Sequence, residues 1–555
     1  MSLSHALLVI TLLWAAIHAI HHLLPSKAQS LLPTTRHQSP THLTLTPLHL
    51  RIHTTAYNTA HDHLAACLKR TPLASSLSHF YDAGTILCVL GMLTALLLLS
   101  LTTGLSALSL TRKLWTTPSD SGLTKRSLVP NGTDAPWITP IIPGITVPLA
   151  HLPLILLSVF LSQIVHEAGH ALAGALDLLP ILSAGASFTV LIPSAFITFP
   201  STALDALPSR TRARIIAAGP FHNLVFWCLL VFLGYLGLGS MQWSVGYKDV
   251  SGAGRVVISV DPGSPLHAYL PPGTLITALD DTPLGSNATT PDTWTFYLTN
   301  TGPSPDWSTT PGWCADTSNT TDTCCNPKSP SSSSSNNLAC FTSTSTSAPT
   351  TNTCLDPIPL LTSPPTTTTR CTSSLNACPT SQTCVRPAQS AQLMRLTIRP
   401  LHLHSLNASS IILWSGSRDE VFEEVHVGTL LPRTPLLPIW LPPQARLFWE
   451  YLTLSTLSLF FFNLLPLPHL DGSSFLKALL HFAFSRHQDE AFSRHQDEDE
   501  EYDLEIGLPR RGNRGRGWGW RSCIWWEGFL MRAIPRCTMG LFVVCTLLGI
   551  INVAL

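Results

Sequence analysis

Residues 152–176 read LPLILLSVFLSQIVHEAGHALAGAL and contain the pattern His-Glu-x-x-His inside an otherwise uncharged apolar run. On a helix, His166 and His170 are four residues apart and share one face, so both imidazoles can reach one metal ion. Glu167 is offset by one residue and can act as general base on a water molecule at that metal. A metal site in so apolar a run predicts an enzyme that works at bilayer depth.

The composition of the chain supports this interpretation. Of its 555 residues, 45% are hydrophobic and 12% are charged, about half the ~25% charged residues of soluble domains. The formal net charge is zero, which argues against nucleic acid as a partner. The sequence therefore predicts a polytopic α-helical membrane protein whose surroundings are the lipid bilayer.

Apolar stretches of the length that a bilayer needs recur along the chain. We predict spans at residues 3–24, 80–105, 140–179, 215–238, 448–465 and 539–555. The first stretch lacks a basic leader and a cleavage site of small residues, which favours an uncleaved span over a signal peptide. A hairpin that turns at Gly104 and reaches Leu110 is an alternative for the second.

Residues 181–200 are apolar but unsuited to a helix, because Gly185, Pro193 and Pro200 interrupt them. Such backbone is tolerated at membrane depth only against protein or a water-filled cavity. We therefore expect a re-entrant strand or hairpin beside the metal site.

A polar region separates the spans of the second half from those of the first. Its segment Val256–Val260 reads as a strand and is followed by a Gly-Ser-Pro turn. This resembles a PDZ-like domain, which binds an extended peptide by strand addition, and another small β domain is the alternative. The expected organisation is N-terminal spans and loops (1–139), a first catalytic half (140–239), a PDZ-like domain (244–430) with an insertion (285–390), a second catalytic half (437–482), a disordered cytosolic loop (483–537) and a C-terminal span (538–555).

The insertion is rich in cysteine, serine and threonine. Eight of the 14 cysteines lie between Cys314 and Cys384. An even number in one loop indicates disulfides and an oxidising lumen. A cytosolic zinc cluster is less favoured, since no Cys-x-x-Cys pair repeats at zinc-finger spacing. Asn287, Asn319 and Asn407 begin glycosylation sequons, which also favours the lumen.

A catalytic zinc site needs a third protein ligand. The soluble pattern with Gly at 173 and His at 176 is absent, because the chain has Ala173 and Leu176. Asp177 lies seven residues beyond His170, about 10 Å along a helix, and is too far to share the ion. No completion of the soluble type lies nearby, so we look for the third ligand on another span.

Asp471 is the best remaining candidate. It is a lone carboxylate at the end of an apolar span, where a charge is costly unless it is paired or bound to metal. Pro466 and Pro468 break the helix just before it and free backbone groups. His469, two residues away, is an alternative ligand.

The HEAGH run in one span and the pattern N-x-x-P-x-P-x-x-D-G at residues 463–472 together resemble the site-2 protease family of intramembrane zinc metalloproteases. The stretch AAGPFHN at residues 217–223 adds to the resemblance, which covers roughly residues 140–483. It implies that His166, His170 and Asp471 bind Zn²⁺ and that Glu167 is the base. Asn223 and Asn463 would position substrate or helices, and helix packing alone is an alternative for Asn223.

The resemblance also implies a function. The family performs regulated intramembrane proteolysis: it cleaves the membrane-spanning segments of membrane-tethered transcription factors, sterol regulatory element-binding-type factors among them, after a first cut on the luminal side. The expected location is the endoplasmic reticulum or Golgi, with the Cys-rich domain luminal. The arginines at 210–214 and 510–521 place the metal site toward the cytosol.

Two other functions fit parts of the sequence. A non-catalytic membrane receptor or scaffold with a structural metal site would not need Glu167, which is intact. A metal transporter would carry more charged residues across its spans than this chain has. We therefore expect a zinc metalloendopeptidase.

Overall fold

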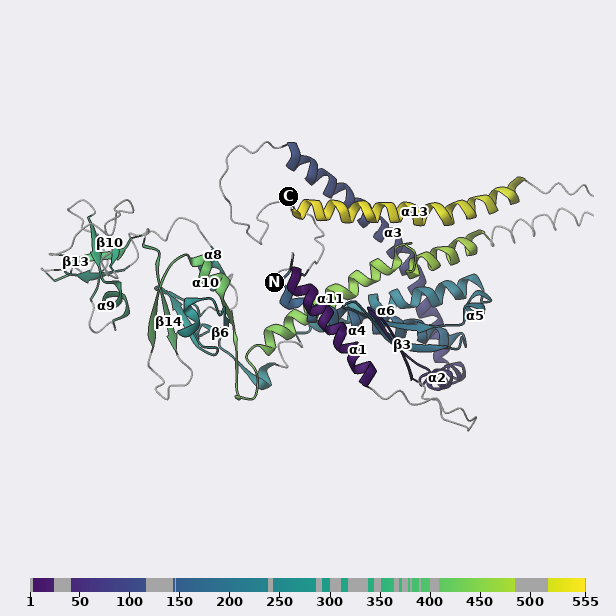
Figure 1. Ribbon diagram of the computed structural model, residues 1–555, viewed down its shortest axis with the longest axis horizontal. Coiled ribbons are helices and arrows are strands. Elements are labelled where there is room, and N and C mark those ends of the chain that lie inside the picture. The colour runs from purple at the N-terminus through teal and green to yellow at the C-terminus, as the bar shows by residue number, and fades with distance from the viewer. Residues whose placement is uncertain are drawn as a thin grey trace, which may run out of the picture. The chain divides into compact units, whose positions relative to one another are not determined.

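The computed structural model folds into two compact units, one of residues Met1–Leu236 with Leu447–Leu555 and one of residues Gly237–Arg446 (Figure 1). The sequons and most of the repeated octapeptide at 483–498 lie outside the described residues, as does most of the arginine cluster at 510–521. The structure describes residues 3–23, 41–115, 143–144, 146–237, 243–285, 292–299, 311–317, 338–343, 351–363, 369–371, 378–379, 382–388, 391–399, 409–484 and 518–554.

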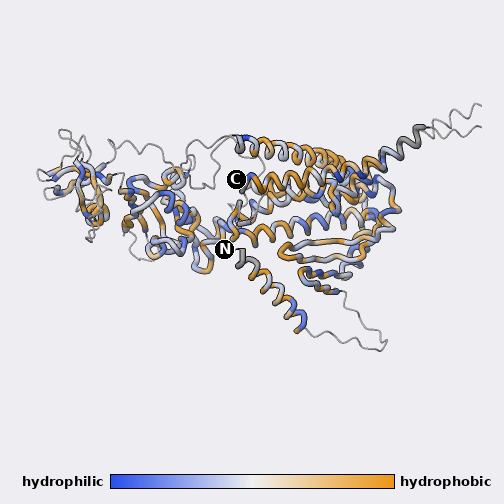
Figure 2. Tube along the Cα trace, turned by 45° about the horizontal axis from the view of Figure 1, so that its top comes forward, coloured by the Kyte–Doolittle hydropathy of each residue, from blue (hydrophilic) through white to orange (hydrophobic). Residues whose placement is uncertain are grey.

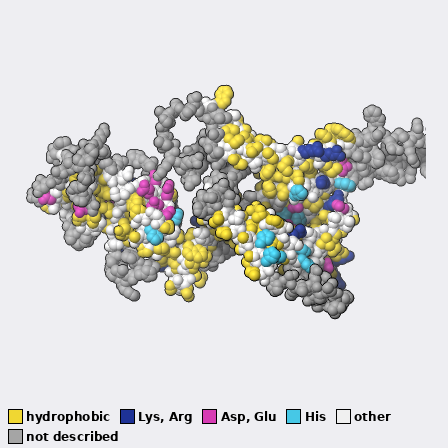
Figure 3. Space-filling model, viewed as in Figure 1, with side chains coloured by type: hydrophobic (Ala, Val, Ile, Leu, Met, Phe, Trp, Pro, Cys, Tyr) yellow, Lys and Arg dark blue, Asp and Glu magenta, His cyan; other side chains and the backbone are white. Residues whose placement is uncertain are grey.

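Five of the described helices are long and apolar enough to cross a membrane. Figure 2 shows the hydrophobic residues that run along them, and on the face seen in Figure 3 hydrophobic side chains spread over the surface of α3 and α13. The helix α1 (Leu3–Leu23) has only a shorter apolar part, Ile10–Leu23, so a first span there stays a prediction. The five helices are α3 (Leu73–Trp115), α4 (Leu152–Leu176), α6 (Ser209–Tyr235), α11 (Leu441–Leu464) and α13 (Trp518–Ala554).

Two helices, α3 and α13, are much longer than the spans expected from sequence. The alternative of a hairpin at Gly104 is wrong, because α3 continues through it without a break. A single glycine costs a helix only about 1 kcal/mol, and the leucine-rich sequence on both sides outweighs that cost. Similarly, α13 begins at Trp518, well before the predicted span at 539–555.

The predicted hairpin between the first two core helices is present and belongs to a larger sheet. Antiparallel pairing joins four strands in the order β1-β2-β3-β4. Sequence reasoning missed β1 and β2, which lie in what we expected to be a loop. Their alternating threonine and apolar residues are nevertheless typical of strands. The strands are β1 (Thr41–Thr46), β2 (His49–Thr54), β3 (Ser183–Thr189) and β4 (Ile192–Thr198).

Small and polar residues hold the membrane helices together. A Cβ atom at Gly84 of α3 would lie 2.4 Å from the ring of Phe221 on α6, so glycine permits a close crossing. The hydroxyls of Ser162 and Thr456, 2.7 Å apart, connect α4 to α11 in the buried interior. The first contact joins α3 to α6, and the second joins α4, which carries the His-Glu-x-x-His motif, to α11.

The second unit contains an antiparallel sheet in the order β15-β14-β7-β6-β16, with β8 paired to β7. Its apolar core includes Val257, Ile276 and Leu396, all fully buried. Helices α8 (Thr293–Thr299) and α10 (Arg418–Glu424) contribute Trp294 and Val421 to the same core. The strands are β6 (Arg255–Val260), β7 (Leu275–Leu279), β8 (Thr282–Pro283), β14 (Leu393–Arg399), β15 (Ser410–Ser415) and β16 (Val425–Gly428). A shorter pair joins β5 (Tyr247–Asp249) to β17 (Leu430–Pro432).

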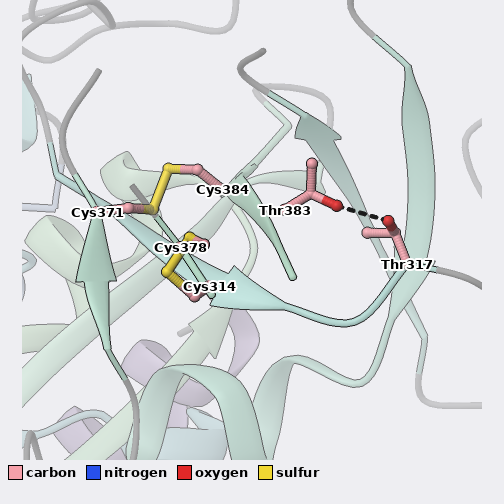
Figure 4. The surroundings of a disulfide bond; sticks show 6 residues. All are labelled: Cys314, Thr317, Cys371, Cys378, Thr383 and Cys384. Carbon is pink, nitrogen blue, oxygen red and sulfur yellow. Dashed lines mark hydrogen bonds between the residues drawn. A yellow bond between two sulfur atoms is a disulfide. The ribbon is translucent and has the colours of Figure 1, made fainter. Parts of the chain in front are cut away.

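The Cys-rich insertion forms its own five-stranded sheet, in the order β11-β10-β13-β9-β12. Two disulfides, Cys314–Cys378 and Cys371–Cys384, lie side by side in it (Figure 4). Because these sulfurs are bonded to one another, they are not thiolate ligands for a metal. Cys340 and Cys354 are disulfide-bonded as well. The strands are β9 (Gly312–Ala315), β10 (Ala339–Ser343), β11 (Asn352–Leu355), β12 (Arg370–Cys371) and β13 (Thr383–Pro387).

A stacked cluster joins the two larger sheets of this unit. The guanidinium groups of Arg370 and Arg395 lie 4.0 and 4.7 Å from the ring centre of Trp313. Both arginines also bind Asp281, with N···O distances of 2.6 Å. Trp313 belongs to the Cys-rich sheet and Arg395 to the other, so the cluster holds them together by cation–π and ionic contacts.

Candidate metal centre

Two histidines and an aspartate from distant parts of the chain meet inside the first unit. The Oδ2 atom of Asp471 lies 2.8 Å from Nε2 of His166 and 3.3 Å from Nε2 of His170. The two Nε2 atoms are 3.1 Å apart. His469, the alternative ligand, is exposed and is not part of this group. Asp177 instead binds Arg214, with an N···O distance of 2.5 Å.

The interruption between α11 and the next helix brings Asp471 to the histidines. The helix ends at Leu464, and a new helix occupies residues 471–484. Between them His469 has a φ of 69°, and at Gly472 a Cβ atom would lie 2.3 Å from the carbonyl oxygen of Leu465. Only glycine, which has no Cβ, permits so close an approach of the backbone at 472 to that carbonyl oxygen.

Helix α6 forms another wall of the site. At Gly219 a Cβ atom would lie 2.3 Å from Nε2 of His170 and 2.7 Å from Nε2 of His166. Gly219 therefore keeps clear the space that faces both imidazoles. The AAGPFHN stretch was singled out from sequence, but the role of this glycine depends on helix packing that the sequence does not reveal.

The three donor atoms fit a zinc ion by chemistry and by spacing. Zinc takes imidazole nitrogen and carboxylate oxygen at about 2.0–2.2 Å in a tetrahedral arrangement, so its ligand atoms lie roughly 3.3 Å from one another. The observed separations of 2.8, 3.1 and 3.3 Å are close to this value. Two neighbouring imidazole nitrogens also need a cation or proton between them, because their lone pairs repel.

Polar groups around the histidines orient the rings. Nδ1–H of His170 donates to the carbonyl oxygen of Ile215 at 2.9 Å, which leaves Nε2 free to bind metal. Nδ1 of His166 lies 3.2 Å from the amide of Asn223 and 3.4 Å from that of Asn463. The buried Oδ1 of Asn223 has no hydrogen-bond partner among the described residues. An amide flip would let this oxygen accept Nδ1–H of a metal-bound His166.

The carboxylate of Glu167 faces the sheet. Its Oε2 accepts a hydrogen bond from the backbone N–H of Ile197 in β4 at 2.9 Å. One turn earlier on α4, Oε1 of Gln163 accepts from the N–H of Ala195 at 3.1 Å. Gln163 was not among the residues predicted from sequence, because nothing in the motif marks it.

The spanning helices and the motif arrangement define a class of protein: a multi-pass membrane metalloprotease. Residues 154–495, more than half of the chain, match the family model of peptidase family M50, and the chain belongs to this family. It is similar to the membrane-bound transcription factor site-2 protease homolog of Arabidopsis thaliana, with 36% identity over 138 residues. That alignment covers 25% of this chain and 26% of the relative. The predicted site-2 protease resemblance is thereby confirmed.

Proposed function

We propose that the protein is an intramembrane zinc metalloendopeptidase. One observation carries the proposal: His166, His170 and Asp471 converge next to Glu167, and the helices around them are apolar enough to span a bilayer. Membership of peptidase family M50 supports peptide hydrolysis as the reaction. A purely structural site would have no use for a carboxylate beside its ligands.

Each residue has a distinct role in this proposal. His166, His170 and Asp471 hold zinc, while Asn223 and Asn463 orient His166 and the substrate. A bound zinc ion supplies Lewis acidity to the peptide carbonyl and to the attacking water. Glu167 accepts a proton from that water and passes it to the leaving amine, as a general base and then a general acid. The surrounding helices exclude bulk water from the reaction.

The proposed substrates are membrane-spanning segments of membrane-tethered transcription factors, including sterol regulatory element-binding-type factors, already cut on the luminal side. The name of the Arabidopsis relative includes a membrane-bound transcription factor, which supports that part of the proposed substrate class. We place the protein in the endoplasmic reticulum or Golgi with its metal site toward the cytosol. The arginines that begin α6 support that orientation.

In this proposal residues 140–239 and 437–482 are the two halves of the catalytic core. Residues 244–430 form a luminal PDZ-like domain, with residues 285–390 as its Cys-rich insertion. The disulfides of the insertion support an oxidising compartment. The sheet around β6 and β7 supports a peptide-binding domain of the PDZ type.

The test is the variant Glu167→Gln, expressed in cells with a reporter tethered by a membrane-spanning segment. We expect release of the reporter to fall to background. Zinc content of the purified variant should stay at one ion per chain, because the ligands are untouched. Undiminished release would contradict the proposal and favour a non-catalytic receptor or scaffold.

A further inference from the structure

The outer edge of β4 is closed by two side chains of α4. As the last strand in the order β1-β2-β3-β4, β4 has one edge without a neighbouring strand. The N–H groups of Ala195 and Ile197 on that edge donate to Gln163 and Glu167. Backbone donors that would otherwise pair with another strand are therefore held by a helix.

The fit between the two elements follows from their geometry. Residues four apart on a helix are separated by about 6.0 Å along its axis. Residues two apart on a strand are separated by about 6.6 Å. The pair 163 and 167 thus matches the pair 195 and 197, and the two side-chain oxygens meet successive outward donors.

No outward donor is left over within β4, all of whose residues are described. The outward positions alternate with those that pair with β3, and they are 193, 195 and 197. Pro193 has no N–H. The outer edge consequently offers two donors, and α4 holds both.

We propose that the oxygens of Gln163 and Glu167 occupy the positions of two carbonyl oxygens of an extended substrate, and that Gln163 is a positioning residue for the reaction. The inference rests on the proposed function. An N···O distance of 2.9–3.1 Å is that of a strand-to-strand hydrogen bond. A substrate segment that takes both donors would lie about 4.8 Å from β4, alongside the helix that carries His166 and His170.

This exchange links binding to catalysis. When a substrate carbonyl replaces Glu167 at the N–H of Ile197, the carboxylate is released toward the metal centre next to it. When another replaces Gln163 at Ala195, the substrate gains a second anchor two residues away. Gln163 therefore competes with substrate for one backbone donor and reduces the fraction of protein that is ready to bind.

The two ends of the Gln163–Ala195 hydrogen bond can be tested separately. Gln163→Met keeps the length of the side chain and removes the acceptor, so the donor becomes free for substrate. Ala195→Pro removes the donor itself, at an outward edge position where proline is tolerated, as Pro193 already shows. We expect KM to fall about 2- to 10-fold in the first variant and to rise by a similar factor in the second, the effect of one hydrogen bond.

The measurement uses the purified full-length protein loaded with zinc in detergent. Its probe is a quenched fluorescent peptide of about 20 apolar residues with a central Gly-Pro pair. Adding Gln163→Met to Ala195→Pro should leave KM unchanged relative to Ala195→Pro alone, because the contested donor is gone. The melting temperature of each variant reports whether it folds.

The outcomes separate this inference from the proposed function. Lack of cleavage by the wild-type protein, or cleavage undiminished by Glu167→Gln, would overturn both the proposed function and this inference. If the wild type cleaves but both variants shift KM in the same direction, the bond is merely structural and only the inference fails. A fall in KM for Gln163→Met together with a rise in KM for Ala195→Pro, in variants that fold, supports the inference.

Discussion

Gly219 shows how one missing side chain can shape a metal centre. Its Cα faces both Nε2 atoms, and any Cβ would lie within 2.7 Å of them. The same α4–α6 crossing relies on Gly169, where a Cβ would lie 2.5 Å from the carbonyl oxygen of Ala218. Glycines on both helices let the imidazoles reach the interface between them.

We predict that Gly219→Ala lowers zinc affinity about 10- to 100-fold, the range seen when residues that orient metal ligands are changed. The added methyl group must push His166 or His170 from its place. Competition with a chromogenic chelator measures the affinity. Gly234→Ala is the matched control on the same helix, because its Cβ would meet nothing closer than 3.7 Å. Equal affinity in both variants would contradict this account of Gly219.

A second prediction concerns the third ligand. Asp471→Ala should lose bound zinc, because two histidines alone do not make a stable catalytic site. His469→Ala should keep one zinc ion per chain, since that side chain is exposed. Zinc measured by elemental analysis of the purified variants decides whether Asp471 or His469 is the ligand. Zinc retained in the first and lost in the second would make His469 the ligand.

The structure brings together three residues that the sequence singled out, His166, His170 and Asp471, but the sequence said less about their surroundings. His166, Glu167 and His170 follow from spacing on one helix, and Asp471 follows from the cost of an unpaired charge in an apolar span. Gln163 and Gly219 could not be found in this way, because their importance depends on which backbone lies opposite them. Such contacts are set by tertiary packing.

At the scale of elements, the four-stranded sheet is the least expected part of the fold. The hairpin β3–β4 was predicted, since glycine and proline exclude a helix there. Its pairing with β2, more than 100 residues earlier, was not, because strand partners far apart in sequence leave no local signal. At Gly185 of β3, a Cβ would lie 2.1 Å from the carbonyl oxygen of Ile52 in β2.

We therefore predict that Gly185→Val separates β2 from β3 and loosens the β1–β2 turn, where the carbonyl oxygen of Leu48 accepts a hydrogen bond from the N–H of Val190 at 2.9 Å. Limited proteolysis of the membrane-embedded protein should then cut near residues 47–48 faster than in the wild type. Gly104→Ala serves as control, because a Cβ there meets nothing within 4 Å. Unchanged protection in Gly185→Val would mean that the close approach of the strands is not required.

For the whole molecule, the second unit depends on covalent links that the first lacks among its described residues. The Cys314–Cys378 bond closes 64 residues of sequence and the Cys371–Cys384 bond closes 13. Chain-entropy arguments then give about 4 kcal/mol for the longer loop and about 3 kcal/mol for the shorter one.

Replacing each cysteine pair by serine should accordingly lower the unfolding temperature of the unit, and more so for Cys314 with Cys378. Differential scanning calorimetry of the full chain measures the unfolding transition of this unit and that of the helical unit. Mild reduction of the wild type should move the same transition and leave that of the helical unit in place. A larger effect from the shorter loop would contradict the entropic argument.

The distance along the chain between the parts of the metal centre has a consequence for biosynthesis. His166 and Asp471 are 305 residues apart. At about 5–20 residues per second, a ribosome needs roughly 15 to 60 s to supply the aspartate after the histidine. Under the proposed function, the nascent chain would throughout that interval have its general base but lack the third zinc ligand, and would therefore be inactive toward neighbouring polypeptides in the translocation machinery. Peptide hydrolysis would then begin only after the segment with Asp471 has been synthesised and has joined the histidines.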